Sequence, residues 1–213
     1  MTPRQPRAVR PAPAGRAPRV HRRPPAPRGS RGPRPPDAII KRLQVALEAD
    51  LDDPTTDGRP GHRWRAALLT ATGALLLWAR RGVVQVLPAA RNVADPDARR
   101  AWESGVTAAV NKSVRRARAR GVSQAVLAAL AAGVVAAHVL REHARLVQAI
   151  ARAAGSDSYI WITRKDTKVR HLHVLLEGTT QRWDDPPLAG EPDFFGHPGD
   201  AAECRCNAWP IAT

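Results

Sequence analysis

The sequence has few cysteines, no acidic residues at its start and few long apolar runs. Each of these features argues against one class of protein: disulfide-bonded, secreted or membrane-spanning. The two cysteines, Cys204 and Cys206, are so close in sequence that a disulfide between them would close a very tight ring. The first 36 residues contain no Asp or Glu, and prolines follow Arg22 and Arg23 where a secretory signal would need an apolar segment. We therefore expect neither a disulfide nor a secretory signal.

The apolar segments predict core helices better than membrane spans. Residues 66–79 form a run that is too short to cross a bilayer alone. Val122 to Leu140 is nearly long enough, but its many alanines are only weakly hydrophobic and it contains Gln124 and His138. A membrane helix at 122–140 remains the alternative, and no membrane partner is expected.

Residues 1–36 form a basic tail that cannot build a core. They contain eleven prolines and ten arginines, which account for most of the net charge of +15. Such a composition predicts a disordered tail with polyproline II bias. Arginines spaced along it can neutralise DNA phosphates without reading base edges, although a passive solvated tail is an equal alternative. The nucleic-acid-binding candidates are Arg4, Arg7, Arg10, Arg16, Arg19, Arg22, Arg23, Arg28, Arg31 and Arg34.

The remaining chain divides into a helical region, residues 37–155, and a small C-terminal module, residues 156–213. Helices are predicted over 37–51, over 62–81, from an Asp95 cap to Gly121, and from Ser123 to Ala154. The module combines two strands, 158–163 and 179–183, with a short helix between them. The fold class is therefore α+β, with a mainly helical N-terminal region.

The short helix of the module determines which histidine faces inward. Asp166 is expected to cap it, Val169, Leu172 and Leu176 would form its apolar stripe, and Gly178 would end it. Because successive helical residues are about 100° apart, His173 falls beside this stripe and His171 points away. Arg170 could reach the same side as His173 and fix a backbone carbonyl or the Asp166 carboxylate.

Cys204 and Cys206 lie two residues apart, so both sulfurs would project from one face of an extended segment. With His173 and His197 as further donors, they would make a possible structural zinc site. The alternative is two small buried side chains beside a His173 that bonds a carbonyl. A nucleophile formed by Cys204 with His173 or His197, and a nuclease centre of His173, Asp166 and Asp184, are weaker alternatives. Residues 190–199 read as a loop anchored by Phe194 and Phe195.

The order of short motifs over 158–210 is distinctive. It runs Trp-x-Thr, Asp-x-x-Val-Arg-x-x-His, an apolar run with Gly, His-Pro-Gly and Cys-Arg-Cys before a Pro. This order resembles the C-terminal domain of phage head morphogenesis proteins, the minor capsid proteins similar to protein F of phage Mu. The motif residues are Trp161, Thr163, Asp166, Arg170, His173, Gly178, His197, Pro198, Gly199, Cys204, Cys206 and Pro210.

The resemblance implies a non-enzymatic component of a tailed phage or prophage that acts in head assembly near the portal. It also implies portal, capsid or scaffold proteins as partners, and a place in the virion or in the bacterial cytoplasm during assembly. The basic tail adds double-stranded DNA as a possible partner. Two other classes stay open: an enzyme or toxin-related protein that uses the C-terminal His and Cys residues, and a sequence-independent basic DNA-binding protein.

Overall fold

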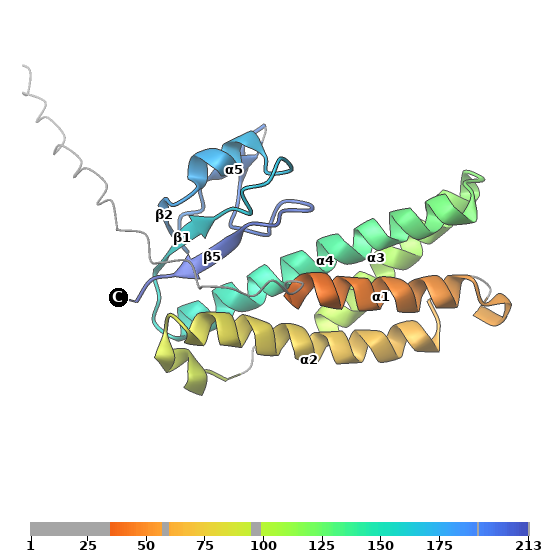
Figure 1. Ribbon diagram of the computed structural model, residues 1–213, viewed down its shortest axis with the longest axis horizontal. Helices are drawn as coiled ribbons and strands as arrows, with labels where there is room; N and C mark the ends of the chain where they lie inside the picture. Colours follow the sequence, from red (N-terminus) through yellow and green to blue (C-terminus); the bar gives the residue numbers. More distant parts are fainter. Residues whose placement is uncertain (1–34, 57–59, 95–98, 191, 213) are drawn as a thin grey trace, which may run out of the picture.

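The computed structural model describes residues 35–56, 60–94, 99–190 and 192–212. Over these residues, long helices come first and a small module with short strands follows (Figure 1), which is the predicted α+β fold. The ten tail arginines and the predicted Asp95 cap lie outside the described residues.

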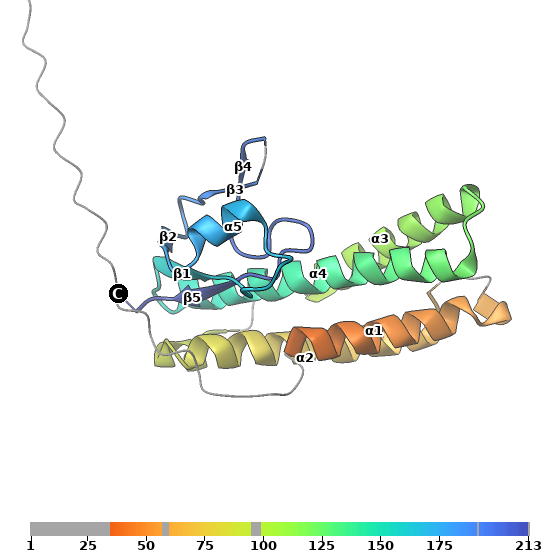
Figure 2. The same cartoon turned by 45° about the horizontal axis from the view of Figure 1, so that its top comes forward.

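The helical region is built from α1 (Pro35–Leu51), α2 (His62–Val84), α3 (Arg99–Ala119) and α4 (Gln124–Ala153). Short 3-10 turns, η1 (Pro54–Thr56) and η2 (Pro88–Asn92), lie after α1 and α2. The helix α4 contacts the other three, and α1 and α2 run side by side along it (Figures 1 and 2). Each helix buries its apolar stripe at this junction, for example Leu43, Leu75, Val110 and Val135, which are fully buried.

Local capping defines where these helices begin and end. The Ser123 hydroxyl accepts a hydrogen bond from Val126 N–H, as expected for the cap of α4. A buried carboxylate caps α2: one oxygen of Asp50, near the end of α1, accepts the N–H groups of Gly61 and Trp64 at 2.7 and 2.8 Å. Gly121 and Gly155 end α3 and α4 in the left-handed region, with φ of +65° and +88°.

By length and composition alone, α2 and α4 could each cross a bilayer. In the described fold, both place one apolar face in the shared core, where Leu68, Leu75, Val135 and Val139 are buried. Only 28% of the apolar window of α2 and 22% of that of α4 are buried, so the packing does not decide between a core helix and a membrane helix at residues 122–140.

The C-terminal module contains β1 (Ser158–Ile162), α5 (His171–Leu176), β2 (Thr180–Arg182), β3 (Leu188–Gly190), β4 (Phe194–Phe195) and β5 (Asn207–Pro210). The antiparallel order β2-β1-β5 forms one sheet, in which Tyr159 pairs with Gln181 on one side and Pro210 on the other. β3 and β4 form a separate antiparallel pair. Both faces of the central strand β1 are covered, because Tyr159 and Trp161 on one face are fully buried and Ile160 on the other is 7% exposed.

Two predictions about this module are wrong. The helix α5 begins at His171, and Asp166 does not cap it: the Asp166 carboxylate accepts Lys168 N–H and pairs with Arg205 at 2.7 Å. Phe194 and Phe195 are not buried loop anchors, because they lie in the short strand β4 and are 39% and 60% exposed.

The module is attached to the helices at a few close contacts. β5 lies along α4 (Figures 1 and 2), and Arg164 pairs with Asp37 of α1 at 2.9 Å. Gly199, at φ +94°, approaches α4 so closely that a Cβ there would lie 2.3 Å from the Cβ of Ala144. The glycine of the His-Pro-Gly motif is therefore required by both backbone conformation and space.

Candidate metal centre

His173 lies in the core of the module, on the inner face of α5. Its side chain is 2% exposed, whereas His171 is exposed, as the helical spacing predicted. Its Nε2 atom lies 2.9 Å from the carbonyl oxygen of Ala189 in β3, and a carbonyl can only accept. Nε2 therefore carries the proton, and the Nδ1 lone pair faces the opposite way.

The atoms that Nδ1 faces are the sulfurs of Cys204 and Cys206, at 3.6 and 3.4 Å. Both cysteines are free and buried, at 3% and 6% exposure. The three donor atoms lie within 4.8 Å of one another and can hold a metal ion. The prediction that the two sulfurs share one face is thus confirmed. His173 can bond a carbonyl and bind a metal at the same time, because Nε2 serves the first role and Nδ1 the second.

A backbone donor and an aromatic ring lie beside the cluster. Gly199 N–H points at Cys204 Sγ from 3.4 Å. The ring of Trp161 meets that of His173 edge to face at 5.2 Å between centroids. The buried Trp161 Nε1 has no hydrogen-bond partner in the described structure. Donors placed around sulfur favour thiolate, the form that binds metals.

The two thiols share one proton in the metal-free chain. A hydrogen bond from Cys206 lowers the pKa of Cys204 to about 4, although burial opposes the shift. The same interaction with Cys204, together with burial, raises the pKa of Cys206. The lowered pKa of Cys204 favours its thiolate, and a bound cation would favour losing the second proton.

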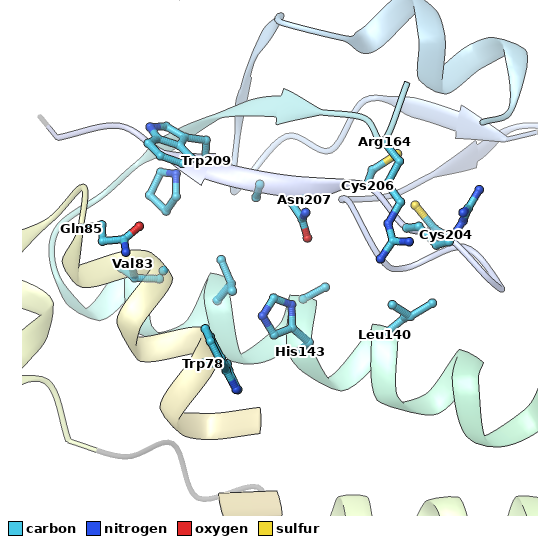
Figure 3. Close-up of a pocket in the computed structure, with 16 residues that line it drawn as sticks. Trp78, Val83, Gln85, Leu140, His143, Arg164, Cys204, Cys206, Asn207 and Trp209 are labelled. Carbon is cyan, nitrogen blue, oxygen red and sulfur yellow. The ribbon is translucent and has the colours of Figure 1, made fainter. Parts of the chain in front are cut away.

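The cluster lies between two cavities. One, of about 290 Å³, is lined by His173, Cys204 and Cys206 together with Lys168 and Glu203. The other, of about 310 Å³ and mainly apolar, separates β5 from α2 and α4, and Cys204 and Cys206 also line it. Figure 3 shows this second cavity with Trp78 and His143 on the helices and Arg164 and the cysteines on the module. Burial here lowers the pKa of His143 to about 4.

His197, the predicted fourth ligand, is not part of the cluster. Its Nδ1 shares a hydrogen bond with the Tyr159 hydroxyl at 2.9 Å, and its ring packs edge-on against Tyr159 and Trp183. Its backbone N–H donates to Asp200, which tightens the loop. The sequence showed a histidine near the cysteines but not which side of the loop its ring would occupy.

The carboxylates of the alternative nuclease centre are also placed elsewhere. Asp184 pairs with Arg182 at 2.8 Å, and Asp166 pairs with Arg205. Both ion pairs are partly or largely exposed, and neither carboxylate is grouped with His173. The described structure therefore gives no support to that arrangement.

The remaining motif residues hold the frame of the cluster. Arg170 donates to the carbonyl of Ala202, two residues before Cys204. Gly178, at φ +75°, donates its N–H to the Trp161 carbonyl at 2.8 Å, and the N–H of buried Thr163 donates to Glu177. Pro198 and Pro210 are buried beside Gly199 and in β5. Sequence reasoning missed the Ala189 carbonyl and Gly199 N–H, because backbone groups carry no signal in residue type.

Comparison of the chain with protein-family models, with curated proteins and with solved structures finds no match in any of the three. The geometry allows two chemistries. A thiolate beside an imidazole can act as a nucleophile, and two thiolates with an imidazole can bind a metal ion. Both sulfurs are largely buried but line two cavities, so the geometry is compatible with either chemistry.

Proposed function

We propose that the chain is a minor structural protein of a tailed-phage head, and that a zinc ion bound by His173, Cys204 and Cys206 holds its C-terminal module in shape. The observation that carries the proposal is that motif residues distant in sequence come together at one buried cluster. Three of the motif residues that resemble the phage head morphogenesis family supply the donors, and Arg170 and Gly199 hold the backbone beside Cys204. Motif residues grouped at one buried cluster are the pattern expected of a structural centre.

The donor set and its dimensions suit zinc. With zinc–sulfur bonds of about 2.3 Å and zinc–nitrogen bonds of about 2.0 Å, a sulfur and a nitrogen ligand of a tetrahedral ion lie about 3.5 Å apart. The Nδ1–sulfur distances of 3.4 and 3.6 Å bracket that value. The bond from Nε2 to Ala189 is the second contact that zinc-binding histidines usually make. Zinc would supply a redox-inert cross-link between α5 and the segment before β5.

The three donors and Glu203 line the same 290 Å³ cavity. A bound ion would find its fourth ligand there, either water or the Glu203 carboxylate, in place of His197. This arrangement keeps the ion at the surface of the module that faces α4, where Ala136 and Leu140 line the same cavity. The cross-link therefore also stiffens the contact between module and helices.

Titration of the full chain with Co²⁺, which reports thiolate ligands by its charge-transfer absorption, tests the ligand set. We expect a saturable signal with one ion per chain, displaced by zinc. Cys204→Ser and Cys206→Ser should each weaken binding at least tenfold, and His173→Gln should do so by tenfold or more. His197→Gln is the matched control and should leave the affinity unchanged. Equal loss for His197→Gln, or binding that survives both cysteine changes, would overturn the ligand assignment.

The head role is tested separately, on particles. We expect the protein at low copy number, beside the portal protein, in DNA-filled heads purified from cells that carry the gene, as measured by quantitative mass spectrometry. In this proposal, α1–α4 contact portal or scaffold and the basic tail lies along packaged DNA. Absence of the protein from heads whose major capsid and portal proteins are detected would refute the head role and leave the zinc site standing.

A further inference from the structure

The hairpin formed by β3 and β4 carries an exposed apolar face, defined here by Leu188 and Phe195. These two side chains pair across the hairpin and are 42% and 60% exposed. Phe194, the neighbour of Phe195 in β4, projects from the opposite face and is 39% exposed. Asp193, exposed and at φ +85°, directly precedes β4. Figure 2 shows β3 and β4 projecting from the module on the side away from α1–α4. An apolar hairpin at the outermost point of a protein is typical of an interaction site.

The sequence around this hairpin face is acidic in a chain that is otherwise basic. Residues 177–203 contain seven Asp or Glu and a single Arg, although the chain as a whole carries +15. Some of these charges are neutralised locally, as in the pair of Asp184 with Arg182. Within the described residues, Asp185 and Asp193 take part in no ion pair. A partner of the hairpin face should therefore be apolar at its centre and basic at its rim.

The chain itself contains such a surface, between α3 and α4. A cavity of about 470 Å³ is lined by the apolar residues Val122, Leu130 and Val134 and by three exposed cations, Lys112, Arg116 and Arg120. Leu130 is 48% exposed there. We call this surface the α3–α4 groove. Its apolar floor and basic rim are complementary to the hairpin face and to Asp193.

The two surfaces cannot meet within one molecule. The groove lies toward the turn that joins α3 to α4, whereas the module packs on the later half of α4, at Leu140 and Ala144 (Figure 1). The hairpin projects away from the helices. We therefore propose that the hairpin face of one copy docks into the α3–α4 groove of a second copy. Such a contact joins different surfaces, so it propagates head to tail and builds a ring or an open chain.

Sedimentation velocity on the full chain, over a wide range of protein concentration, tests this contact. We expect reversible association beyond the dimer that weakens at high salt, because the charged rim is exposed. Phe195→Ser and Arg116→Glu should each weaken association at least tenfold. Both residues are exposed, so neither change should alter the fold, which circular dichroism checks. Leu77→Ser and Arg65→Glu are matched controls on exposed positions of α2 and should associate like the parent chain.

Mixing the two defective variants is the decisive arm. The Phe195→Ser chain keeps its groove and the Arg116→Glu chain keeps its hairpin, so an equal mixture should form a one-to-one heterodimer although each alone is monomeric. A parent chain that stays monomeric at every concentration would overturn the proposal. So would association that persists in either variant, or a mixture that shows no heterodimer. None of these outcomes depends on the head role.

Discussion

At the scale of single residues, Gly199 connects the metal cluster to the helices. Its N–H points at Cys204, and its α-carbon lies against Ala144 of α4. Its φ of +94° is a conformation that L-residues with a side chain rarely adopt. Adding a methyl group at Gly199 would therefore strain the loop backbone and also collide with Ala144 of α4.

Gly199→Ala should therefore be strongly destabilising. Left-handed strain and overpacking together predict a loss of about 2 to 4 kcal/mol in the free energy of unfolding, measured by urea denaturation. Gly155→Ala is the matched control, because Gly155 has a similar φ but open space around its α-carbon, and it should lose only about 1 to 2 kcal/mol. Adding Ala144→Gly should recover part of the Gly199→Ala loss, and no recovery would contradict the clash.

His143 should make stability depend on pH. Burial in the cavity between α4 and β5 holds its folded-state pKa at about 4, below the ordinary value of 6.5. The unfolded chain therefore binds this proton more readily, so stability is full above pH 6.5 and falls as pH drops toward 4. The slope should approach about 1.4 kcal/mol per pH unit. His143→Leu should remove that slope, measured as the difference between the two chains in urea at pH 7 and pH 5. An equal slope in both chains would contradict the assignment.

At the scale of elements, the sequence pattern predicted correctly the helix start and the side-chain orientations that depend on local sequence and periodicity. Ser123 as the start of α4, the inward face of His173 and the shared face of the two cysteines are all confirmed. The errors concern residues whose surroundings are set by tertiary contacts. Asp166 had the residue type of a cap, but Arg205, distant in sequence, pairs with it instead. Likewise, the Tyr159 hydroxyl on β1 determines the place of the His197 ring, and periodicity in the loop carries no signal for it.

The junction of α1 with α2 gives an element-scale prediction. Asp50 is fully buried and one of its carboxylate oxygens accepts two backbone N–H groups at the start of α2. Asp50→Ala would leave both donors unsatisfied and should lower the free energy of unfolding by about 2 to 3 kcal/mol. Asp50→Asn keeps an acceptor and should lose less. Thermal unfolding of the two variants beside the parent chain makes the comparison, and equal stability of all three would contradict the capping role.

At the scale of the whole molecule, charge is distributed unequally. Most of the excess positive charge belongs to residues 1–36, while residues 177–203 are acidic. The proposed head protein thus has a basic tail suited to DNA, a helical platform with a basic groove, and a module whose outer hairpin is apolar and acidic. The tail suits DNA, and the groove and the hairpin suit each other in two copies, which is consistent with a component that connects several parts of a particle.

DNA binding by the tail should be sensitive to salt and indifferent to sequence. Each arginine that neutralises a phosphate adds about 0.9 to the slope of log affinity against log salt concentration. Deleting residues 1–34, which hold ten arginines, should remove most of that slope, measured by fluorescence anisotropy with two unrelated duplexes of equal length. A slope that is unchanged by the deletion would place DNA binding on the folded part of the chain.

The most direct test of the metal-centred proposal is the zinc content of the full chain, purified without added metal and measured by elemental analysis. We expect about one zinc per chain, and its removal by a chelator should lower the thermal unfolding midpoint of the parent chain but not that of the Cys204→Ser, Cys206→Ser double variant. A folded parent chain that contains no zinc, takes up none when zinc is supplied, and has the same midpoint as the double variant would contradict the proposal.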